Sequence, residues 1–221
     1  MTELILVRHG ETAWNTERRL QGHIDTPLNH EGKRQAQALA AMLASLAGGI
    51  GAAPFARLFS SDLDRTFQTA RPIGDLLDLE IIRDPRLRER CFGAFEGLSH
   101  DEVKERYPQA WVQWQAREVD ARYPAGERQA ETLTEFTGRV RDALVDIAST
   151  HPGQRIIVVT HGGFLDSAYR LATGMSLSQA RNFDVRNASI NRFEWNEASG
   201  LQLLEWGVVA HLATSMDEIV R

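Results

Sequence analysis

The fold is indicated first by the stretch LILVRHG at residues 4–10. Four apolar residues stop there abruptly at Arg8, His9 and Gly10. A short, continuous apolar run of this kind is typical of a strand that is buried on both faces, as in a parallel sheet. Similar runs occupy residues 56–59 and 155–160, where they stop at SSD and HGG. The three runs therefore predict buried strands that end in polar residues.

Helical patterns lie between these runs. Residues 31–47 are rich in Ala, Leu and Gln, and residues 129–150 carry an apolar stripe at helical spacing. Residues 62–78 also favour a helix, although Pro72 is expected to kink or interrupt it. Strands that alternate with helices predict an α/β fold of three layers, with a mainly parallel central sheet and helices on both faces.

Two further segments complete the predicted architecture, a single domain over residues 1–221. Residues 188–195 alternate in polarity, 196–200 form a turn and 201–206 return, which predicts an antiparallel hairpin at the edge of the sheet. Residues 93–128 contain no good strand, and we interpret them as a mostly helical insertion over the active site. The free edge of the hairpin could pair with a second copy, so a homodimer stays open as an alternative to a monomer.

The composition argues against several classes of protein. The chain has 221 residues, of which 43% are hydrophobic and 25% charged, as in ordinary globular proteins. Its net charge of −5 argues against a general nucleic-acid binder. Cys91 is the only cysteine, which excludes an intrachain disulfide, and no apolar run approaches the roughly 18 residues that span a membrane. We expect a cytoplasmic protein without nucleic-acid or membrane partners.

The polar ends of the predicted strands point to an anion site. Ligands of open α/β sheets bind beyond the carboxyl ends of the strands. The chain places Arg8 and His9 at one such end, His161 at another, and Arg65 about one turn into the helix after a third. Because arginine forks match phosphate oxygens, two arginines and two histidines at one edge predict a site for a phosphate or a phosphate ester.

The same residues suggest a reaction. A neutral imidazole at His9 is a good nucleophile toward phosphorus, and the arginines with His161 could offset the phosphoryl charge without a metal. A proton donor is still needed for the leaving alcohol, and Glu89 is the best candidate because it follows a short strand candidate at residues 80–83. The glycines at 10, 162 and 163 are expected to let the backbone approach the anion, so Gly162 is counted with the phosphate-binding residues.

These residues fall in motifs that resemble the histidine phosphatase superfamily, which includes cofactor-dependent phosphoglycerate mutases and many phosphatases. The motifs are RHGET (8–12) with Asn15, RLQG (19–22), DTPL (25–28), Gly32, QA (35–36), SSDLDRTFQTA (60–70), LRERCFGAFEG (87–97), GE (126–127) and THGG (160–163). They occur in the order of the family and span residues 4 to about 170.

The resemblance implies a role for each matched residue. His9 would be the phosphorylated nucleophile and Glu89 the proton donor, while Arg8, Arg65 and His161 would form the phosphate pocket. Three further residues match positions that line this pocket: Asn15, Gln21 and Gly22. The chain has neither a dinucleotide-binding glycine loop nor a P-loop, and we expect no cofactor and no metal.

Several other polar residues are given structural roles. Glu96 is expected to hold backbone or an arginine, Glu11 to support the turn after the nucleophile, and Cys91 to pack. Of the remaining histidines, His23 follows Gln21 and Gly22 closely enough to face the rim of the pocket, but it is not expected to be catalytic.

Departures from the mutase pattern favour the phosphatase branch. By resemblance, mutases carry His-Tyr where this chain has Cys91 and Phe92, a paired Arg-Arg in the insertion, and HGN where this chain has HGG. Phosphatases usually carry GES where this chain has GER, and Arg128 could either add a charge for an acidic substrate or face solvent.

We therefore predict a metal-independent phosphomonoester hydrolase that forms a phosphohistidine intermediate on a small phosphorylated metabolite. A cofactor-dependent phosphoglycerate mutase is the alternative. A non-catalytic module that binds a phosphorylated ligand is disfavoured, because nucleophile, acid and pocket cations are all present.

Overall fold

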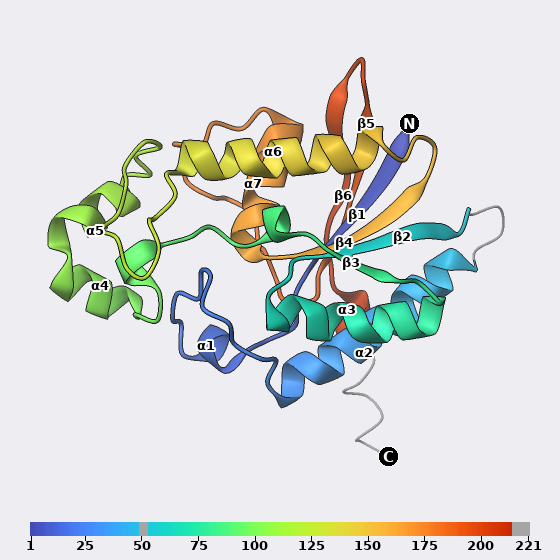
Figure 1. The fold of residues 1–221 in the computed structure, drawn as a ribbon, viewed down its shortest axis with the longest axis horizontal. Coiled ribbons are helices and arrows are strands. Elements are labelled where there is room, and N and C mark those ends of the chain that lie inside the picture. The colour runs from blue at the N-terminus through green and yellow to red at the C-terminus, as the bar shows by residue number, and fades with distance from the viewer. Residues whose placement is uncertain (49–52, 214–221) are drawn as a thin grey trace.

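The computed structural model describes residues 1–48 and 53–213; residues 49–52 and 214–221, which the predicted single domain includes, lie outside the described residues. The strands are β1 (Thr2–Arg8), β2 (Phe55–Ser60), β3 (Ile81–Arg83), β4 (Arg155–Thr160), β5 (Ile190–Asn196) and β6 (Gly200–Val208). Within the described residues they form one sheet in the order β3-β2-β4-β1-β5-β6 (Figure 1).

The sheet is mainly parallel, as predicted. Strands β1 to β4 run parallel to one another, whereas β5 is antiparallel to β1 and forms the antiparallel hairpin with β6. The register places Arg8 opposite Thr160 and Ser60 opposite Val159. The residues that follow β1, β2 and β4 therefore emerge side by side at one edge of the sheet.

Helices cover both faces, which confirms the three-layer prediction (Figure 1). The helices α2 (His30–Ala47), α3 (Asp64–Leu77) and α8 (Ala210–Ala213) lie on one face, and α6 (Leu133–Ser149) and α7 (Gly162–Thr173) on the other. Alternate residues of β1 serve the two layers: Ile5 and Val7 pack toward α2 and α3, whereas Leu4 and Leu6 pack toward α6 and α7. Each such side chain contributes about 1.5–3 kcal/mol by leaving water.

Two helices differ from the sequence prediction at particular residues. Helix α6 begins at Leu133 rather than near 129, because Thr132 and Glu135 form a capping box that satisfies its first N–H groups. Helix α3 is not interrupted at Pro72. Proline removes one backbone hydrogen bond there, but Ala70 and Ile73 are fully buried against the sheet and hold the helix in place.

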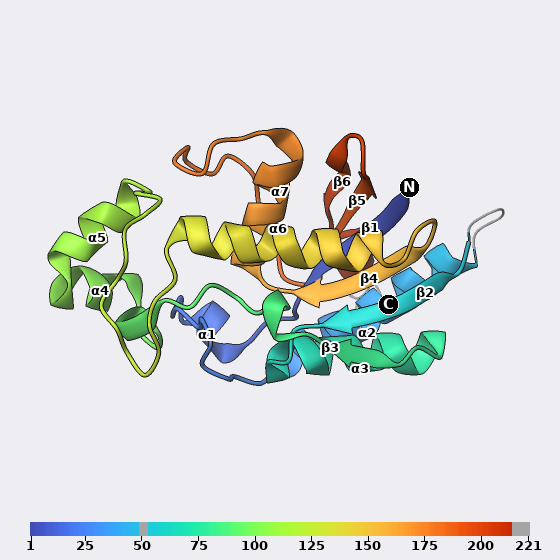
Figure 2. The same ribbon diagram turned by 45° about the horizontal axis from the view of Figure 1, so that its top comes forward.

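The segment 93–128 is helical only in its first part. It contains the short 3-10 helix η2 (Gly93–Phe95), α4 (His100–Arg106) and α5 (Pro108–Gln115), whereas residues 116–132 form turns and loops. Pro124 and Gly126 disfavour helix there. Phe95 and Tyr123 stack at 4.6 Å between ring centroids and form a small core of its own with Val103 and Ala130. In Figure 2 this segment projects from the end of the molecule that also holds α1 (Ala13–Thr16).

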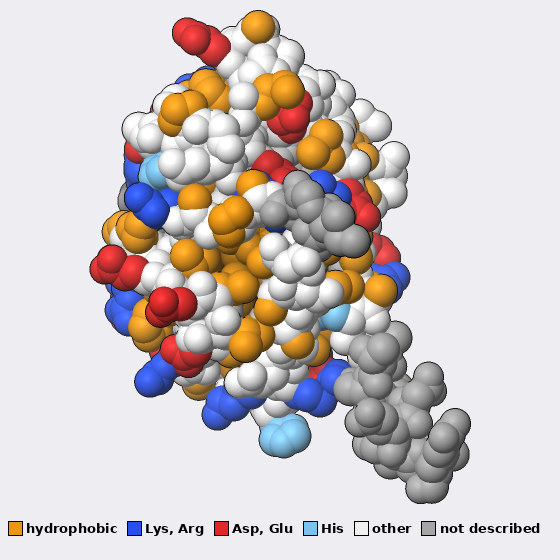
Figure 3. All heavy atoms as spheres, turned by 90° about the vertical axis from the view of Figure 1, so that its right-hand side faces the viewer, with side chains coloured by type: hydrophobic (Ala, Val, Ile, Leu, Met, Phe, Trp, Pro, Cys, Tyr) orange, Lys and Arg blue, Asp and Glu red, His pale blue; other side chains and the backbone are white. Residues whose placement is uncertain are grey.

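The opposite end of the molecule has a different surface. Figure 3 shows it from the side that carries the N-terminus in Figure 1, with hydrophobic side chains in the middle and charged side chains of both signs around them. None of the helices within residues 1–48 and 53–213 combines the length and the apolar character that crossing a membrane requires.

Candidate active site

A cavity of about 390 Å³ opens at the carboxyl ends of the parallel strands. Most of the predicted site residues line it: Arg8, His9, Asn15, Gln21, Gly22, Arg65, Glu89 and Gly162. His161 is fully buried beside it, with its ring centroid 5.2 Å from that of His9 in an edge-to-face arrangement. The fold thus brings together side chains that are up to about 150 residues apart in the sequence.

His9 is held as a neutral imidazole with one nitrogen free. Its Nδ1 lies 2.7 Å from the carbonyl oxygen of Gly10, and because a carbonyl only accepts, Nδ1 must carry the proton. Nε2 then keeps its lone pair. Burial lowers the pKa of His9 well below its ordinary value of 6.5, and the positive charges of Arg65 and Arg8 lower it further. The ring is therefore uncharged and nucleophilic at neutral pH.

The turn at Gly10 needs a residue without a side chain. A Cβ at this position would lie 2.4 Å from the carbonyl oxygen of Gly32, at the start of α2. The loop of His9 therefore packs directly on the first turn of a helix, and this contact fixes the direction of the imidazole.

Two arginines flank the histidine, Arg65 fully buried and Arg8 partly buried. Arg65 donates to the carbonyls of Ile24 and Gly22 at 3.0 and 2.8 Å, and Arg8 donates to that of Val185 at 2.7 Å. The Nε atoms of both arginines are buried without a hydrogen-bond partner among the described residues. Burial lowers the pKa of each arginine to about 10, so both stay charged. Unsatisfied buried donors are costly, and an anion in the cavity would satisfy them.

His161 packs edge-to-face against His9 without lining the cavity itself. Its Nε2 lies 2.9 Å from the hydroxyl oxygen of Ser61, while its Nδ1 is buried with no partner among the described residues. Burial lowers the pKa of His161 well below 6.5, and the charge of Arg65 adds to that effect. In the tautomer in which the Ser61 hydroxyl donates to Nε2, the ring proton lies on Nδ1, the nitrogen without a partner among the described residues.

Glu89 is fixed by two backbone N–H groups. Its Oε2 accepts from Gly163 at 2.8 Å, at the start of α7, and its Oε1 accepts from Arg90, also at 2.8 Å. A Cβ at Gly163 would lie 2.2 Å from Oε1 of this carboxylate. The carboxylate therefore fills the space that a side chain at position 163 would occupy.

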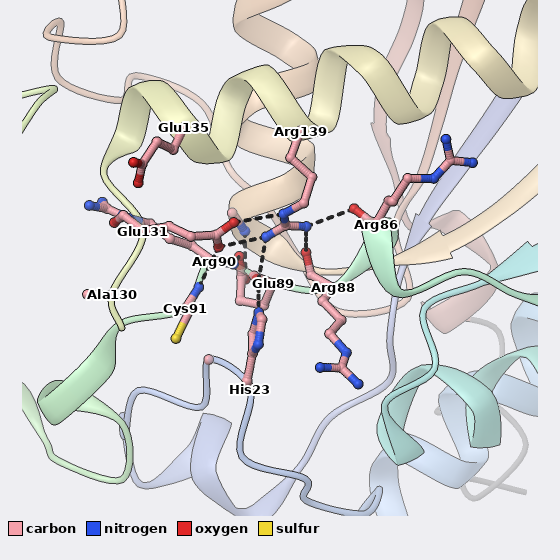
Figure 4. A network of polar contacts seen from close by, with 12 residues as sticks. His23, Arg86, Arg88, Glu89, Arg90, Cys91, Ala130, Glu131, Glu135 and Arg139 are labelled. Atoms are coloured by element: carbon pink, nitrogen blue, oxygen red, sulfur yellow. Dashed lines mark hydrogen bonds and ion pairs between the residues drawn. The ribbon is translucent and has the colours of Figure 1, made fainter. Parts of the chain in front are cut away.

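A network of polar contacts around Glu89 holds its main chain (Figure 4). Arg139 of α6 donates to the carbonyls of Arg88 and Glu89 at 2.9 and 3.1 Å, and it pairs with Glu131 at 2.7 Å. His23 places its Nε2 2.8 Å from the same Glu89 carbonyl. The network thus ties the proton-donor candidate to a helix and to a loop from the other side of the cavity.

The remaining predicted residues shape the cavity wall. The Oδ1 of Asn15 accepts from the backbone of Thr12 at 3.0 Å and from the amide of Asn187 at 3.2 Å. The Oε1 of Gln21 accepts from the hydroxyls of Thr12 and Thr26 at 3.1 and 2.7 Å. With its oxygen engaged in this way, Gln21 keeps its amide NH₂ as the group available to a ligand.

The glycines of the wall allow close approach. Gly22 has a φ of +51°, and a Cβ there would lie 2.1 Å from the carboxylate of Glu96. That carboxylate accepts from the backbone N–H groups of His23 and Phe92 at 3.0 Å, which is the structural role expected of Glu96. A Cβ at Gly162 would lie 3.3 Å from Nε of Arg8, so the backbone at 162 packs closely on that guanidinium.

The other candidate residues, Cys91 and Arg128, are not placed for catalysis. Burial raises the pKa of the Cys91 thiol to about 11, which leaves it protonated and inert at neutral pH. Arg128 is exposed and does not line the cavity. Within residues 1–48 and 53–213, no three His, Cys, Asp or Glu side chains form a group that could hold a metal ion.

Sequence reasoning missed part of the site. Among the described residues, six arginines and three acidic residues line the cavity. Arg90, Arg117 and Arg181 were not singled out as ligand contacts, because none lies at a strand end. The supporting pair of Arg139 and Glu131 was missed as well. The number of arginines around the LRER motif and in the insertion was the available signal, but it does not show which of them face inward.

Comparison with known proteins identifies the family. The model of the histidine phosphatase superfamily (branch 1) matches residues 4–208. The chain is 37% identical over 212 residues to phosphoglycerate mutase-like protein 4 of Arabidopsis thaliana, covering 95% of this chain and 86% of that protein. It is also 37% identical over 216 residues to a metal-independent phosphoserine phosphatase of the same plant, covering 97% and 84%.

A solved structure gives the same result. Bacillus stearothermophilus YhfR superposes with a TM-score of 0.83 at 29% identity, covering 96% of this chain and all of that one. The match of the family model over nearly the whole described fold is decisive. This protein belongs to branch 1 of the histidine phosphatase superfamily, among relatives named as phosphatases and as mutase-like proteins.

Proposed function

We propose that the protein is a metal-independent phosphomonoester hydrolase that acts on a small phosphorylated metabolite through a phosphohistidine intermediate at His9. The observation that carries the proposal is a buried, neutral imidazole beside two arginines, Arg65, which is fully buried, and Arg8, which is partly buried. The Nε atoms of both arginines are buried and lack partners among the described residues. A phosphate dianion would satisfy those donors and present phosphorus to the histidine.

The reaction divides into two balanced steps. Nε2 of His9 attacks phosphorus while the bond from phosphorus to the alcohol oxygen breaks, and Glu89 gives that oxygen a proton. A water molecule then attacks the phosphohistidine, its proton passes to the Glu89 carboxylate, and the N–P electron pair returns to Nε2. An ester and one water thus yield an alcohol and inorganic phosphate. Arg8, Arg65 and His161 would hold the phosphoryl oxygens throughout.

Gly163 supports hydrolysis over phosphoglycerate mutation. Mutases of the family have asparagine at this position, whereas here the Glu89 carboxylate takes the space of a Cβ at 163. Cys91 and Phe92, which replace the His-Tyr pair of the mutases, lie in the same loop. The name of the metal-independent phosphoserine phosphatase among the relatives supports the same assignment.

A phosphoglycerate mutase is the second candidate, because a relative of equal identity bears a mutase-like name. The two activities give different products. A mutase would convert 3-phosphoglycerate into 2-phosphoglycerate without releasing phosphate, whereas a hydrolase would release it.

The test is phosphate release from 4-nitrophenyl phosphate and 3-phosphoglycerate in the presence of EDTA. We expect turnover by the wild type and a loss of about 10⁴-fold or more in His9→Ala. His30→Ala is the matched control, since His30 is exposed at the start of α2 and should keep full activity. Turnover by His9→Ala equal to that of the wild type would contradict the assignment of the nucleophile, and interconversion without phosphate release would establish the mutase.

A further inference from the structure

Asp166 on α7 is surrounded by three arginines from different parts of the chain. It accepts from Arg170 at 3.0 Å, from Arg181 at 2.9 Å and from Arg117 at 3.2 Å. Asp166 is 4% exposed. Burial alone would raise the pKa of its carboxyl, but the hydrogen bond from Arg170 and the charges of the three arginines lower it below its usual value. The group therefore carries three positive charges and one negative charge.

The three arginines differ in what they face. Arg170 is fully buried and also donates to the carbonyl of Ser176, so it serves the packing of the loop after α7. Arg117 and Arg181 line the cavity together with Asp166. A purely structural cluster would be expected to balance its charge, since like charges at close range raise the free energy of the fold. Here the excess positive charge, on Arg117 and Arg181, lies at the wall of the cavity instead.

Arg181 keeps donors available for a ligand. Its Nε is engaged by Asp166, whereas its Nη groups make no hydrogen bond to any residue that the structure describes. Its side chain is 43% exposed. Arg117 is held by a bond from its Nε to the carbonyl of Leu177 and has a φ of +49°, a backbone conformation that costs energy for a residue other than glycine. Both guanidinium groups are thus held in place at the cavity wall.

The cluster lies close to the phosphate end of the cavity. Asp166 follows Gly163, whose N–H holds Glu89, by three residues on the same helix, and one turn of helix rises about 5.4 Å. The charge of Arg181 also contributes to the lowered pKa of Arg8. Arg8 and Arg181 thus line the same cavity, and they are close enough for their charges to interact.

We propose that Arg181, oriented by Asp166 and assisted by Arg117, binds a carboxylate of the substrate. A carboxylate is the planar partner that matches a guanidinium fork. The preferred substrates are then small phosphomonoesters with a carboxylate a few carbons from the ester. The inference rests on the proposed function in placing the phosphate at His9, and it goes further by naming the substrate class and the residue that selects it.

The experiment compares two ligands that differ only at the selecting group. 3-Phosphoglycerate has a carboxylate where glycerol 3-phosphate has a hydroxymethyl group. Binding of each is measured calorimetrically to His9→Ala, which does not turn them over, and to that variant with Arg181→Gln added. We expect 3-phosphoglycerate to bind about tenfold more tightly than glycerol 3-phosphate, and Arg181→Gln to remove this preference while glycerol 3-phosphate changes less than about twofold.

Arg186→Gln in the same background is the matched control. Arg186 lies in the same loop, is exposed and pairs only with exposed Asp184 among the described residues, so the preference should survive its substitution. Equal binding of the two ligands before substitution, a preference that persists in Arg181→Gln, or an equal loss for both ligands would overturn the inference. A wild type that releases no phosphate while the preference still depends on Arg181 would refute the hydrolase and leave the carboxylate site standing.

Discussion

The two ends of the cavity are built in different ways. At one end, Arg8 is the last residue of β1, His9 and His161 directly follow β1 and β4, and Arg65 lies in the first turn of α3. All of these except Arg8 are at least nine-tenths buried. At the other end, Arg117 and Arg181 come from loops without regular structure and are partly exposed.

This difference separates two tasks. Transfer of a phosphoryl group requires positions that are fixed closely, and strand ends in a packed sheet provide them. Choice of substrate requires side chains that can differ between related proteins, and loops tolerate such sequence changes without disturbing the core. We therefore expect substitutions at the sheet end to lower turnover of every phosphate ester, and substitutions at the loop end to change which ester is preferred.

Arg65→Gln tests the sheet end most severely. We expect kcat/KM to fall by about 10²–10³ for all phosphate esters, because a buried charge-assisted donor to the phosphoryl oxygens is lost. Steady-state phosphate release measures the effect. Arg71→Gln, an exposed arginine of the same helix, should stay within twofold of the wild type. An Arg65 variant that loses activity only on carboxylate-bearing esters would contradict the assignment of phosphoryl transfer to the sheet end and substrate choice to the loop end.

Gly163→Ala tests whether the carboxylate position sets the activity. The added Cβ would displace the end of a flexible Glu89 side chain rather than backbone, so the melting temperature should change little. We expect about a 10²-fold loss of kcat on alkyl phosphates and a smaller loss on 4-nitrophenyl phosphate, whose leaving group needs no proton.

Gly10→Ala provides the contrast. Its Cβ would meet the backbone oxygen of Gly32, so the expected result is a lower melting temperature. An unstable Gly163→Ala variant would show instead that this position serves packing.

Arg139→Gln tests support of the same carboxylate from a distance. Arg139 donates to the main chain of Glu89 but does not itself line the cavity, so it acts as a positioning residue. We expect kcat on alkyl phosphates to fall about tenfold with KM unchanged, and 4-nitrophenyl phosphate to be less affected. Arg141→Gln, two residues along α6 and exposed, should behave as the wild type. A rise in KM without a fall in kcat would assign Arg139 to binding instead.

The smallest expected effect is on stability below neutral pH. His9 and His161 have pKa values lowered by burial, so the unfolded chain binds protons near pH 6.5 that the native protein does not bind. The free energy of unfolding should therefore decrease as the pH falls below 6.5, by at most about 1.4 kcal/mol per pH unit for each histidine, with no contribution above that pH. Urea denaturation between pH 7.5 and 5 measures the slope.

Two variants sharpen the pH measurement. His9→Gln should lower the number of protons taken up on unfolding by about one, and with it the slope of the free energy of unfolding against pH. His30→Gln, at an exposed position, should leave this slope unchanged. Inorganic phosphate should restore stability at low pH, because an anion between the histidines favours their charged forms. A slope that is the same in both variants would show that the sheet end does not titrate as its burial implies.

The extent of prediction from sequence follows the same division. Apolar runs that stop at polar residues locate β1, β2 and β4, and the rule for the carboxyl ends of parallel strands places Arg8, His9 and His161 at one edge of the sheet. The start of α6 at Leu133 and the unbroken α3 were not foreseen, because capping and tertiary packing outweigh local propensity.

The α/β architecture, the family motifs and the residues of the phosphate end can be inferred from the chain alone, since these depend on local patterns and on a general property of parallel sheets. The folded arrangement was needed to show that Arg139 holds the Glu89 loop and that Arg117 and Arg181 meet at Asp166. Those contacts join loops and helices that are 15–50 residues apart in the chain. The direction of a loop side chain depends on packing that no local pattern encodes.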